Sequence, residues 1–347
     1  VWNTPSPFGK ASPFGYFAGG TTNGSTVDRI DFSNDSDDSV VKGPLTAARG
    51  YAAGLSSPSH GYVAGGWQNP TYYTTVDRID YNNDTATASP KGPLSLSRRG
   101  SGSSTSADCG YIGGGLYPSY LSTVDRIDYS NDTATASPKG PLSVTKEGLS
   151  ASSARANGFT VVGPALVSNA AAVAGSFNPT TFGYFGGGNG PKSTVDRIDY
   201  SNDTATASVK GPLSVITYAL AATSSSFFGY FAGGGAPEKS TVSRVDYSND
   251  TATASEKGPL SLGRRYFSAT GNTNFGYFVG GQTSSSPGGV SIIDRVDYSN
   301  DTATAVAKGP LSVIKYSRGA TGNANFGYFG GGTPGPSVST VSRIDYS

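Results

Sequence analysis

The sequence predicts an all-β protein, a seven-bladed β-propeller of four-stranded blades that forms one domain over residues 1–347. Composition is the first observation behind this prediction. Gly (49) and Pro (21) are frequent, Tyr (21) and Phe (16) are abundant, and Met is absent. Residues that suit strands and turns therefore outnumber strong helix formers. An apolar fraction of 35 % still supplies a packed core, which excludes a wholly disordered chain.

An internal repeat is the second observation. The string Thr-Val-Asp-Arg-Ile-Asp recurs with small changes, at intervals of 47 to 51 residues and one interval of 71 residues. A second string, Gly-aromatic-x-x-Gly-Gly, also occurs seven times, and Gly-Pro-Leu followed by Ser or Thr occurs six times. The first string places its Val or Ile at Val27, Val76, Val124, Val195, Val242, Ile293 and Val341.

The spacing within the units is the third observation. In six units, 16 residues separate the Val of the first string from the Gly of Gly-Pro-Leu. Only the loop after the Gly-Gly pair varies freely in length. A rigid frame with one variable loop per unit is typical of a scaffold that carries recognition on its loops.

Each unit divides into four short strands, illustrated by residues 218–223, 229–234, 241–247 and 251–255. A Ser-Asn-Asp-Thr turn between the last two suits a tight hairpin, because Asn and Asp hydrogen-bond to their own backbone. Four strands in about 49 residues are the pattern of one propeller blade. The seventh unit shows only three strands, and we expect residues 1–4 to supply the fourth and close the ring.

The long interval between Leu142 and Gly183 contains a partial repeat. We therefore place an insertion within residues 143–182, between blades three and four. No charged residue occurs from Ala156 to Pro191, and exposed apolar residues mark interfaces. The expected partner interface consists of Phe159, Val161, Val162, Leu166, Val167 and Phe177. An extra hairpin packed on its own blade is the alternative.

Several landmarks resemble the kelch repeat: the doublet Gly65-Gly66, the strand Val76 to Tyr81, and Arg98 or Arg99 before the next blade. The resemblance covers nearly the whole chain and implies the same propeller fold. Ala or Thr replaces the Trp that kelch repeats carry on the outer strand. The units Val-Asp-Arg-Ile-Asp-Tyr-Ser-Asn-Asp-Thr-Ala-Thr-Ala are also similar to repeats in uncharacterised virion proteins of marine bacteriophages, which implies a virion or appendage component.

One Arg per unit is expected to pin neighbouring blades together. Strand alternation places Val124, Arg126 and Asp128 on one face, where Arg126 and Asp128 should meet the next blade. A buried Arg needs a partner, so we interpret these residues as structural, with ligand binding as the alternative. The set is Arg29, Arg78, Arg126, Arg197, Arg244, Arg295 and Arg343.

Catalytic and metal-binding patterns are missing, so we expect no enzymatic activity, no cofactor and no metal. His60 is the only histidine, and one His does not make a zinc or copper site. Cys109 occupies the same slot of the next unit, and packing is the expected role of both, although a Cys-His pair is the alternative. The acidic run from Asp31 to Asp38 lacks the glycine and the final Glu of a calcium loop.

Charge and hydropathy exclude further classes. A net charge of +1 without a basic stripe argues against nucleic acid as a partner. No run of 18 apolar residues is present, so we expect no membrane insertion. No basic segment precedes an apolar one, which argues against a signal peptide. A chain without Met is expected to be a processed product or a fragment.

Two post-glycine loops carry aromatic residues and no charge. They hold Trp67, Tyr72, Tyr73, Tyr117 and Tyr120, at the same position of neighbouring blades. Tyr and Trp offer rigid amphipathic contact area, which suits stacking on sugar rings. Glycan or receptor binding is therefore one interpretation. Packing of the rings onto their own loops or onto a neighbouring protein is the other.

The sequence leads to two main functional hypotheses. The first is a non-enzymatic adhesive protein at the virion or cell exterior, which recognises a host-surface glycan or receptor. The second is a purely architectural protein that contacts copies of itself or other particle proteins. A glycan-processing enzyme is the third possibility, and the near absence of Glu argues against it.

Overall fold

The computed structural model describes residues 14–20, 24–31, 39–106, 108–153, 182–190, 192–235, 237–285, 289–311, 314, 316, 319–322, 325–330, 332 and 341–346. Over these residues the chain contains strands, turns and no helix. Accordingly, no helix long and apolar enough to cross a membrane is found in them.

Seven antiparallel sheets follow one another along the chain, and each pairs its strands in sequence order. Blades 2 to 6 have four described strands, and blades 1 and 7 have three. An additional two-stranded hairpin, β6–β7, extends from blade 2. The strands are, for blade 1, β1 (Phe14–Gly20), β2 (Gly24–Asp31) and β3 (Val40–Lys42); for blade 2, β4 (Ala53–Ser56), β5 (His60–Ala64), β6 (Trp67–Gln68), β7 (Thr71–Tyr72), β8 (Val76–Asp80) and β9 (Ser89–Lys91); for blade 3, β10 (Gly102–Thr105), β11 (Cys109–Gly113), β12 (Val124–Asp128) and β13 (Ser137–Lys139); for blade 4, β14 (Ser150–Ser153), β15 (Phe182–Gly186), β16 (Val195–Asp199) and β17 (Ser208–Lys210); for blade 5, β18 (Ala221–Ser224), β19 (Phe228–Ala232), β20 (Val242–Asp246) and β21 (Ser255–Lys257); for blade 6, β22 (Ser268–Gly271), β23 (Phe275–Val279), β24 (Ile293–Asp297) and β25 (Val306–Lys308); and for blade 7, β26 (Gly319–Gly322), β27 (Phe326–Gly330) and β28 (Val341–Asp345).

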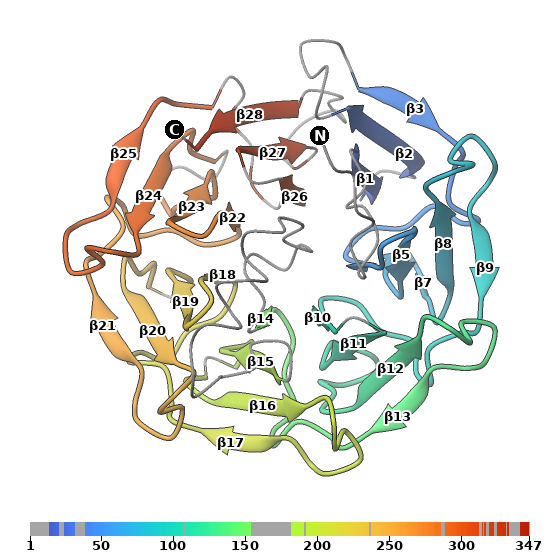
Figure 1. Ribbon diagram of the computed structural model, residues 1–347, viewed down its shortest axis with the longest axis horizontal. Helices are drawn as coiled ribbons and strands as arrows, with labels where there is room; N and C mark the ends of the chain where they lie inside the picture. The colour runs from blue at the N-terminus through green and yellow to red at the C-terminus, as the bar shows by residue number, and fades with distance from the viewer. Residues whose placement is uncertain are drawn as a thin grey trace, which may run out of the picture.

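The blades stand around a central axis as a seven-bladed β-propeller (Figure 1). The first strand of blades 2 to 7 lies nearest the axis, and the fourth strand of blades 2 to 6 lies at the outer edge. The all-β class and the seven blades predicted from the repeat are therefore confirmed. The expected closing strand, residues 1–4, lies outside the described residues.

The hydrophobic core lies between the blades, and strand alternation explains why. Val124 of β12 packs with Leu142 and Phe185 toward blade 4, whereas Ile127 of the same strand packs with Leu55 of blade 2. Both are nearly inaccessible to solvent. Opposite faces of one strand thus contact opposite neighbours, so apolar residues occur on both faces of each blade.

Stacked tyrosine pairs add a second contact between blades. Tyr62 of blade 2 stacks on Tyr129 of blade 3 at 5.0 Å between ring centroids, and Tyr111 of blade 3 stacks on Tyr200 of blade 4 at 4.7 Å. Four further interfaces have such a pair. These rings come from the second strand of one blade and the residue after the third strand of the next.

The position of the insertion expected within residues 143–182 differs from the prediction, because it interrupts the sequence of blade 4 and does not lie between blades three and four. β14 follows Leu142 at the usual distance and pairs with β15, so it is the first strand of blade 4. The extra chain therefore falls between the first two strands of that blade. The expected interface residues, Phe159, Val161, Val162, Leu166, Val167 and Phe177, lie outside the described residues.

Candidate functional site

The loops between the second and third strands lie on the same side of the ring as the crossovers between blades. The amide of Gly66, at the start of one such loop, donates to the Arg98 carbonyl of the following crossover at 2.8 Å. Gly50, in the preceding crossover, forms a β-bridge with Trp67. The variable loops and the crossovers therefore build one face, which we call the loop face.

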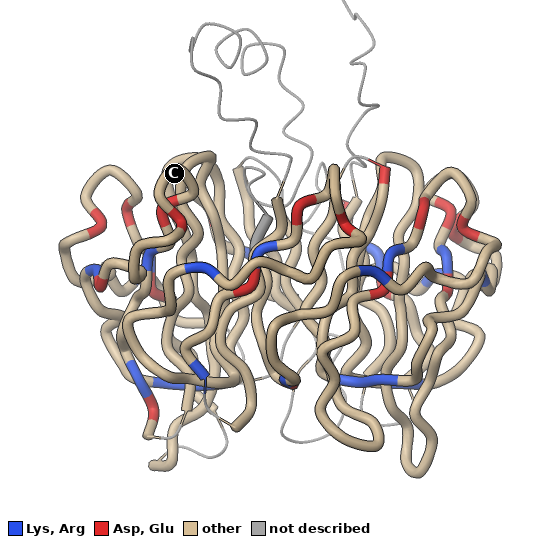
Figure 2. Tube along the Cα trace, turned by 90° about the horizontal axis from the view of Figure 1, so that it is seen from below, with Lys and Arg blue, Asp and Glu red and all other residues tan. Residues whose placement is uncertain are grey.

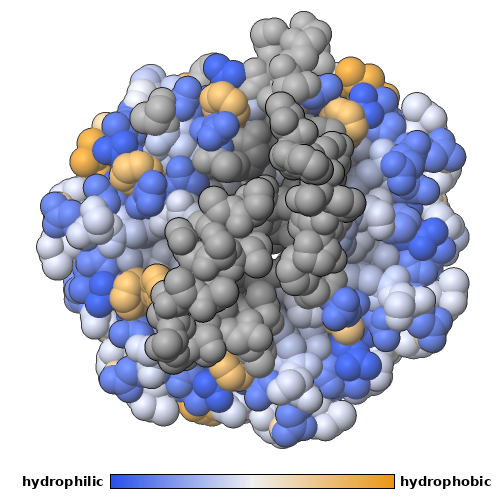
Figure 3. Space-filling view, viewed as in Figure 1, coloured by the Kyte–Doolittle hydropathy of each residue, from blue (hydrophilic) through white to orange (hydrophobic). Residues whose placement is uncertain are grey.

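In Figure 2 many Asp and Glu residues follow the upper rim. Lys and Arg lie at mid-height and below, and further acidic residues lie beside them there. Figure 3 shows one face, on which most visible described residues are hydrophilic and the apolar ones stand apart from one another.

An aromatic cluster occupies the loop face over blades 2 and 3. Tyr72 stacks on Tyr117 with ring centroids 4.3 Å apart, so the two variable loops meet, as their shared position on neighbouring blades predicts. The ring centroid of Trp67 lies 6.3 Å from that of Tyr72 and 6.3 Å from that of Tyr51. The rings of Trp67 and Tyr72 are thus partly covered by other rings.

Exposure separates the cluster into supporting and accessible rings. Tyr51, Tyr117 and Tyr120 expose 51 %, 44 % and 38 % of their surface, while Trp67, Tyr72 and Tyr73 are only partly exposed. The guanidinium of Arg49 lies over the ring of Tyr73, 5.8 Å from the ring centroid. A ligand on this surface therefore meets Tyr51, Tyr117 and Tyr120 first.

Charge also enters the cluster, although the two aromatic loops themselves carry none. The Arg99 guanidinium lies 5.1 Å from the Trp67 ring centroid and 5.5 Å from that of Tyr72. Its Nε also pairs with Glu147 at 3.4 Å. Because Arg99 comes from a crossover, the loop sequences gave no sign of it. The cluster is consequently both aromatic and hydrogen-bonding, with one cation balanced by one anion.

A series of left-handed residues links the crossovers on the loop face. Tyr51, Gly100, Gly148, Ala219 and Tyr266 have φ values between 53° and 63°. The amide of each of the last four donates to the carbonyl of the preceding member, at 2.9 to 3.1 Å. Such φ values are unusual for Tyr, so the surrounding bonds hold these two residues in place. We call this hydrogen-bonded series the collar.

A second aromatic and charged group lies beside the collar at blades 5 and 6. Arg265 donates to the Tyr218 hydroxyl at 3.0 Å and pairs with Glu238 at 3.7 Å. Its guanidinium lies 5.4 Å from the Tyr266 ring centroid. Burial, and then the neighbouring Tyr218 hydroxyl, raises the pKa of Tyr266.

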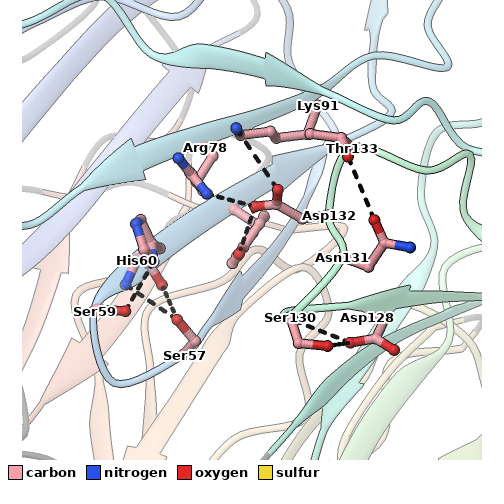
Figure 4. A network of polar contacts seen from close by, with 11 residues as sticks. Ser57, Ser59, His60, Arg78, Lys91, Asp128, Ser130, Asn131, Asp132 and Thr133 are labelled. Atoms are coloured by element: carbon pink, nitrogen blue, oxygen red, sulfur yellow. Dashed lines mark hydrogen bonds and ion pairs between the residues drawn. The ribbon is translucent and has the colours of Figure 1, made fainter.

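The repeated arginines connect successive blades. Arg78 of β8 donates to Asp132 in the Asn-Asp-Thr turn of the next blade at 2.9 Å, and Tyr62 and Lys91 reach the same carboxylate at 3.0 and 3.6 Å (Figure 4). We call a Tyr, Arg and Lys set of this kind a carboxylate socket. Arg29, Arg126, Arg197 and Arg244 make the same ion pair, with Asp84, Asp203, Asp250 and Asp301.

The partner of these arginines differs from the expected one. Asp128, on the strand of Arg126, accepts hydrogen bonds from Ser130 in its own turn and does not reach the next blade. The arginine side chains are also 21 % to 28 % exposed, whereas the turn aspartates are buried. Arg295 and Arg343 contact Phe275 and Phe326 by cation–π geometry.

A fully buried ion pair near the crossovers was not foreseen. Arg98 donates to Asp125 at 3.0 Å and also to the carbonyls of Gly114 and Thr123. The first Asp of the repeated string is the partner in each such pair, and the pairs are Arg49–Asp77, Arg98–Asp125, Lys146–Asp196 and Arg264–Asp294. The basic residue follows the Leu of the Gly-Pro-Leu string at a constant spacing, and this spacing was the sequence signal from which the pairs could have been predicted.

His60 and Cys109 are part of the blade packing. The Ser59 hydroxyl bonds to Nδ1 of His60 at 2.8 Å, and the ring lies 6.4 Å from Tyr62. Burial lowers the pKa of His60 and raises that of the Cys109 thiol to about 11. Within the described part of the chain, no group of three His, Cys, Asp or Glu is placed to hold a metal ion.

No protein-family model matches the chain, and a search among curated proteins finds no match.

Proposed function

We propose that this propeller is a non-enzymatic structural and adhesive protein of a virion or appendage, which recognises a host-surface glycan or receptor at the loop face. The aromatic cluster around Arg99 is the observation that carries the proposal. The similarity of the units to kelch repeats and to repeats in marine bacteriophage virion proteins supports an extracellular or virion-surface setting and partners from the same particle.

The chemistry of the cluster fits a neutral, hydroxyl-rich ligand. Tyr51, Tyr117 and Tyr120 present accessible rings, and aromatic faces stack on the apolar faces of sugars. Arg99 and Glu147 supply donors and acceptors while their charges cancel. The stacked pair Tyr72–Tyr117 holds the surface in one conformation, which lowers the entropic cost of binding.

Double replacement of Tyr117 and Tyr120 by Ala tests the proposal. Both side chains are exposed at the ring surface, and loss of the Tyr72–Tyr117 stack should cost only about 0.5–1.5 kcal/mol. The melting temperature should therefore fall by a few degrees at most, while glycan-array or host-cell binding falls at least tenfold. Tyr266→Ala serves as the control, because this exposed tyrosine lies at blade 6, outside the aromatic cluster. Undiminished binding by the double variant would contradict the proposal.

A purely architectural role is the second candidate, and exposed apolar residues on the crossovers favour it. Ile216 and Ile314 are 59 % and 52 % exposed at the same position of two crossovers, and Leu96 and Leu262 are 43 % and 37 % exposed one residue earlier in two others. Contact with other particle proteins would remove this apolar surface from water. If this role holds, replacing Ile216 and Ile314 by Ser should impair assembly, and the unaltered chain should show no binding on a glycan array.

A further inference from the structure

Tyr72 and Tyr117 form a stacked pair at the surface of the loop face. Their ring centroids lie 4.3 Å apart, with 25° between the ring planes. The two residues are far apart in the sequence and belong to the variable loops of blades 2 and 3. Tyr117 exposes 44 % of its surface and Tyr72 is partly exposed, so solvent reaches both rings.

The other stacked tyrosine pairs of the described residues lie in the joints between blades. Tyr62, for example, is 1 % exposed, and its hydroxyl donates to Asp132 at 3.0 Å. By contrast, neither the Tyr72 hydroxyl nor the Tyr117 hydroxyl makes a hydrogen bond to a described residue. The surface pair is therefore the one whose rings a solvent-borne reagent reaches and whose hydroxyl protons can pass directly to water.

The neighbours of the pair favour chemistry between these two rings. Trp67 lies farther from Tyr72, at 6.3 Å between ring centroids, and its ring is tilted by 53°. The Arg99 guanidinium lies 5.5 Å from the Tyr72 ring centroid, and this positive charge disfavours a second one on the ring. Removal of an electron from Tyr72 should therefore be coupled to loss of its hydroxyl proton, which leaves a neutral phenoxyl radical.

Stacking is the arrangement in which two such radicals combine. The half-filled orbital of a phenoxyl radical stands perpendicular to the ring and has density on the carbons ortho to the oxygen. Rings that lie face to face direct these orbitals toward each other, whereas a tilted pair does not. Because the loops hold the two rings in place, coupling becomes a step within one molecule rather than a collision between two.

We propose that Tyr72 and Tyr117 are a site of oxidative cross-linking, at which a peroxide and a peroxidase convert the pair to dityrosine. Each tyrosine gives up one electron and its hydroxyl proton, and the two radicals form a carbon–carbon bond between ortho carbons. The hydrogen on each of these carbons then moves to the ring oxygen, which restores both phenols. One hydrogen peroxide takes up the two electrons and two protons and becomes two water molecules, so the chain loses two hydrogen atoms.

The cross-link would join the variable loops of blades 2 and 3 covalently, and it does not depend on glycan binding. The full chain, at low concentration, is treated with a haem peroxidase and hydrogen peroxide. Dityrosine fluorescence should appear while the chain stays monomeric in denaturing electrophoresis. Trypsin, which cleaves after Lys and Arg, releases residues 50–78 and 100–126. These peptides should be found joined, two hydrogen atoms lighter than their sum, with fragmentation placing the bond at Tyr72 and Tyr117.

Variants of the full chain complete the test. Tyr117→Phe keeps a ring for the stack but has no hydroxyl to oxidise, so the yield of joined peptides should fall at least tenfold. Tyr120→Phe is the matched control, because Tyr120 lies in the same loop and is 38 % exposed but stacks on no described ring, and its yield should be unchanged. Absence of joined peptides, cross-links mainly between molecules, or full yield from Tyr117→Phe would each overturn the proposal.

Discussion

Two kinds of ion pair join the blades, and they tolerate change differently. The five carboxylate sockets are partly exposed and use the same four residue types, Tyr, Arg, Lys and Asp. The buried pairs near the crossovers vary: at blade 5, Thr217 and Ser243 replace the basic residue and the aspartate. There Ser243 bonds to Ser214 at 2.7 Å, and Thr217 donates to the Gly233 carbonyl.

At blade 5, then, the buried pair is replaced as a pair. Two desolvated charges compensate each other, and the two hydroxyl groups at blade 5 bond to Ser214 and to the Gly233 carbonyl, but one buried charge alone is costly. The carboxylate of a socket has three partners, so the loss of one of them is shared among several partly hydrated bonds. Three experiments examine this difference.

Arg98→Ala should give the largest effect. It leaves Asp125 fully buried without its cation and removes bonds to two carbonyls, so the free energy of unfolding should fall by about 3–5 kcal/mol. The double variant Arg98→Thr with Asp125→Ser copies blade 5 and should recover more than half of the loss. Urea unfolding measures both; a double variant no more stable than the single one would contradict the pairwise interpretation.

Lowering the pH should reduce the stability that the carboxylate sockets contribute. Burial alone would raise the pKa of Asp84, but hydrogen bonds from Tyr16, Lys42 and Arg29 outweigh it and hold the pKa below its usual range. A carboxyl with a lowered pKa in the folded state stabilises the protein above its unfolded pKa of about 3.9, and that stability is lost as pH falls through the folded value.

The free energy of unfolding of the unaltered protein and of the Asp84→Asn variant, measured at pH 7, 4 and 3, tests this effect. The variant should be about 1–2 kcal/mol less stable at pH 7, because its bonds become neutral and the Arg29 side chain is 21 % exposed. Below pH 4 the two proteins should converge. A constant difference across the range would show that the carboxylate charge is irrelevant.

Tyr129→Phe should have the smallest effect. The ring keeps its stack on Tyr62 at 5.0 Å, and the hydrogen bond between its hydroxyl and Thr105, at 3.1 Å, is lost. A loss of about 0.5–1.5 kcal/mol in thermal or urea unfolding is expected. A loss as large as that of Arg98→Ala would mean that hydroxyl contacts, rather than ion pairs, hold the joints.

The sequence was sufficient for the fold because its signals are local and repeated. Val124 and Ile127 lie on opposite faces of one strand, and the Gly-Gly pair marks the end of another. The number and order of strands in a blade could therefore be predicted from a single repeat unit. The partner of Arg126 could not be predicted from the sequence, because Asp203 lies 77 positions away and looks like an ordinary turn residue. Only the packing of whole blades brings these two together.

The candidate site was predictable to the same extent. Tyr72 and Tyr117 share a loop position on neighbouring blades, and this sufficed to place them on one face of the ring. That the two rings stack on each other is seen only in the structure. Arg99 was missed because it comes from a crossover, and the left-handed backbone of Tyr51 has no local sequence signal. The exposure of each aromatic ring could not be predicted from the sequence either, because it depends on how one loop covers the next.

At each carboxylate socket, the glycine of a Gly-Pro-Leu segment packs so closely on the next unit's turn that an added Cβ would lie 1.5 to 1.7 Å from a carbonyl oxygen. This close fit has a consequence for how such a chain diversifies. Each joint consists of a Gly-Pro-Leu segment on one unit and an Asn-Asp-Thr turn on the next, and every complete unit carries both. Duplication or exchange of a unit by recombination therefore brings matching joints with it. New loop sequences enter the ring already compatible with their neighbours, without compensating changes elsewhere.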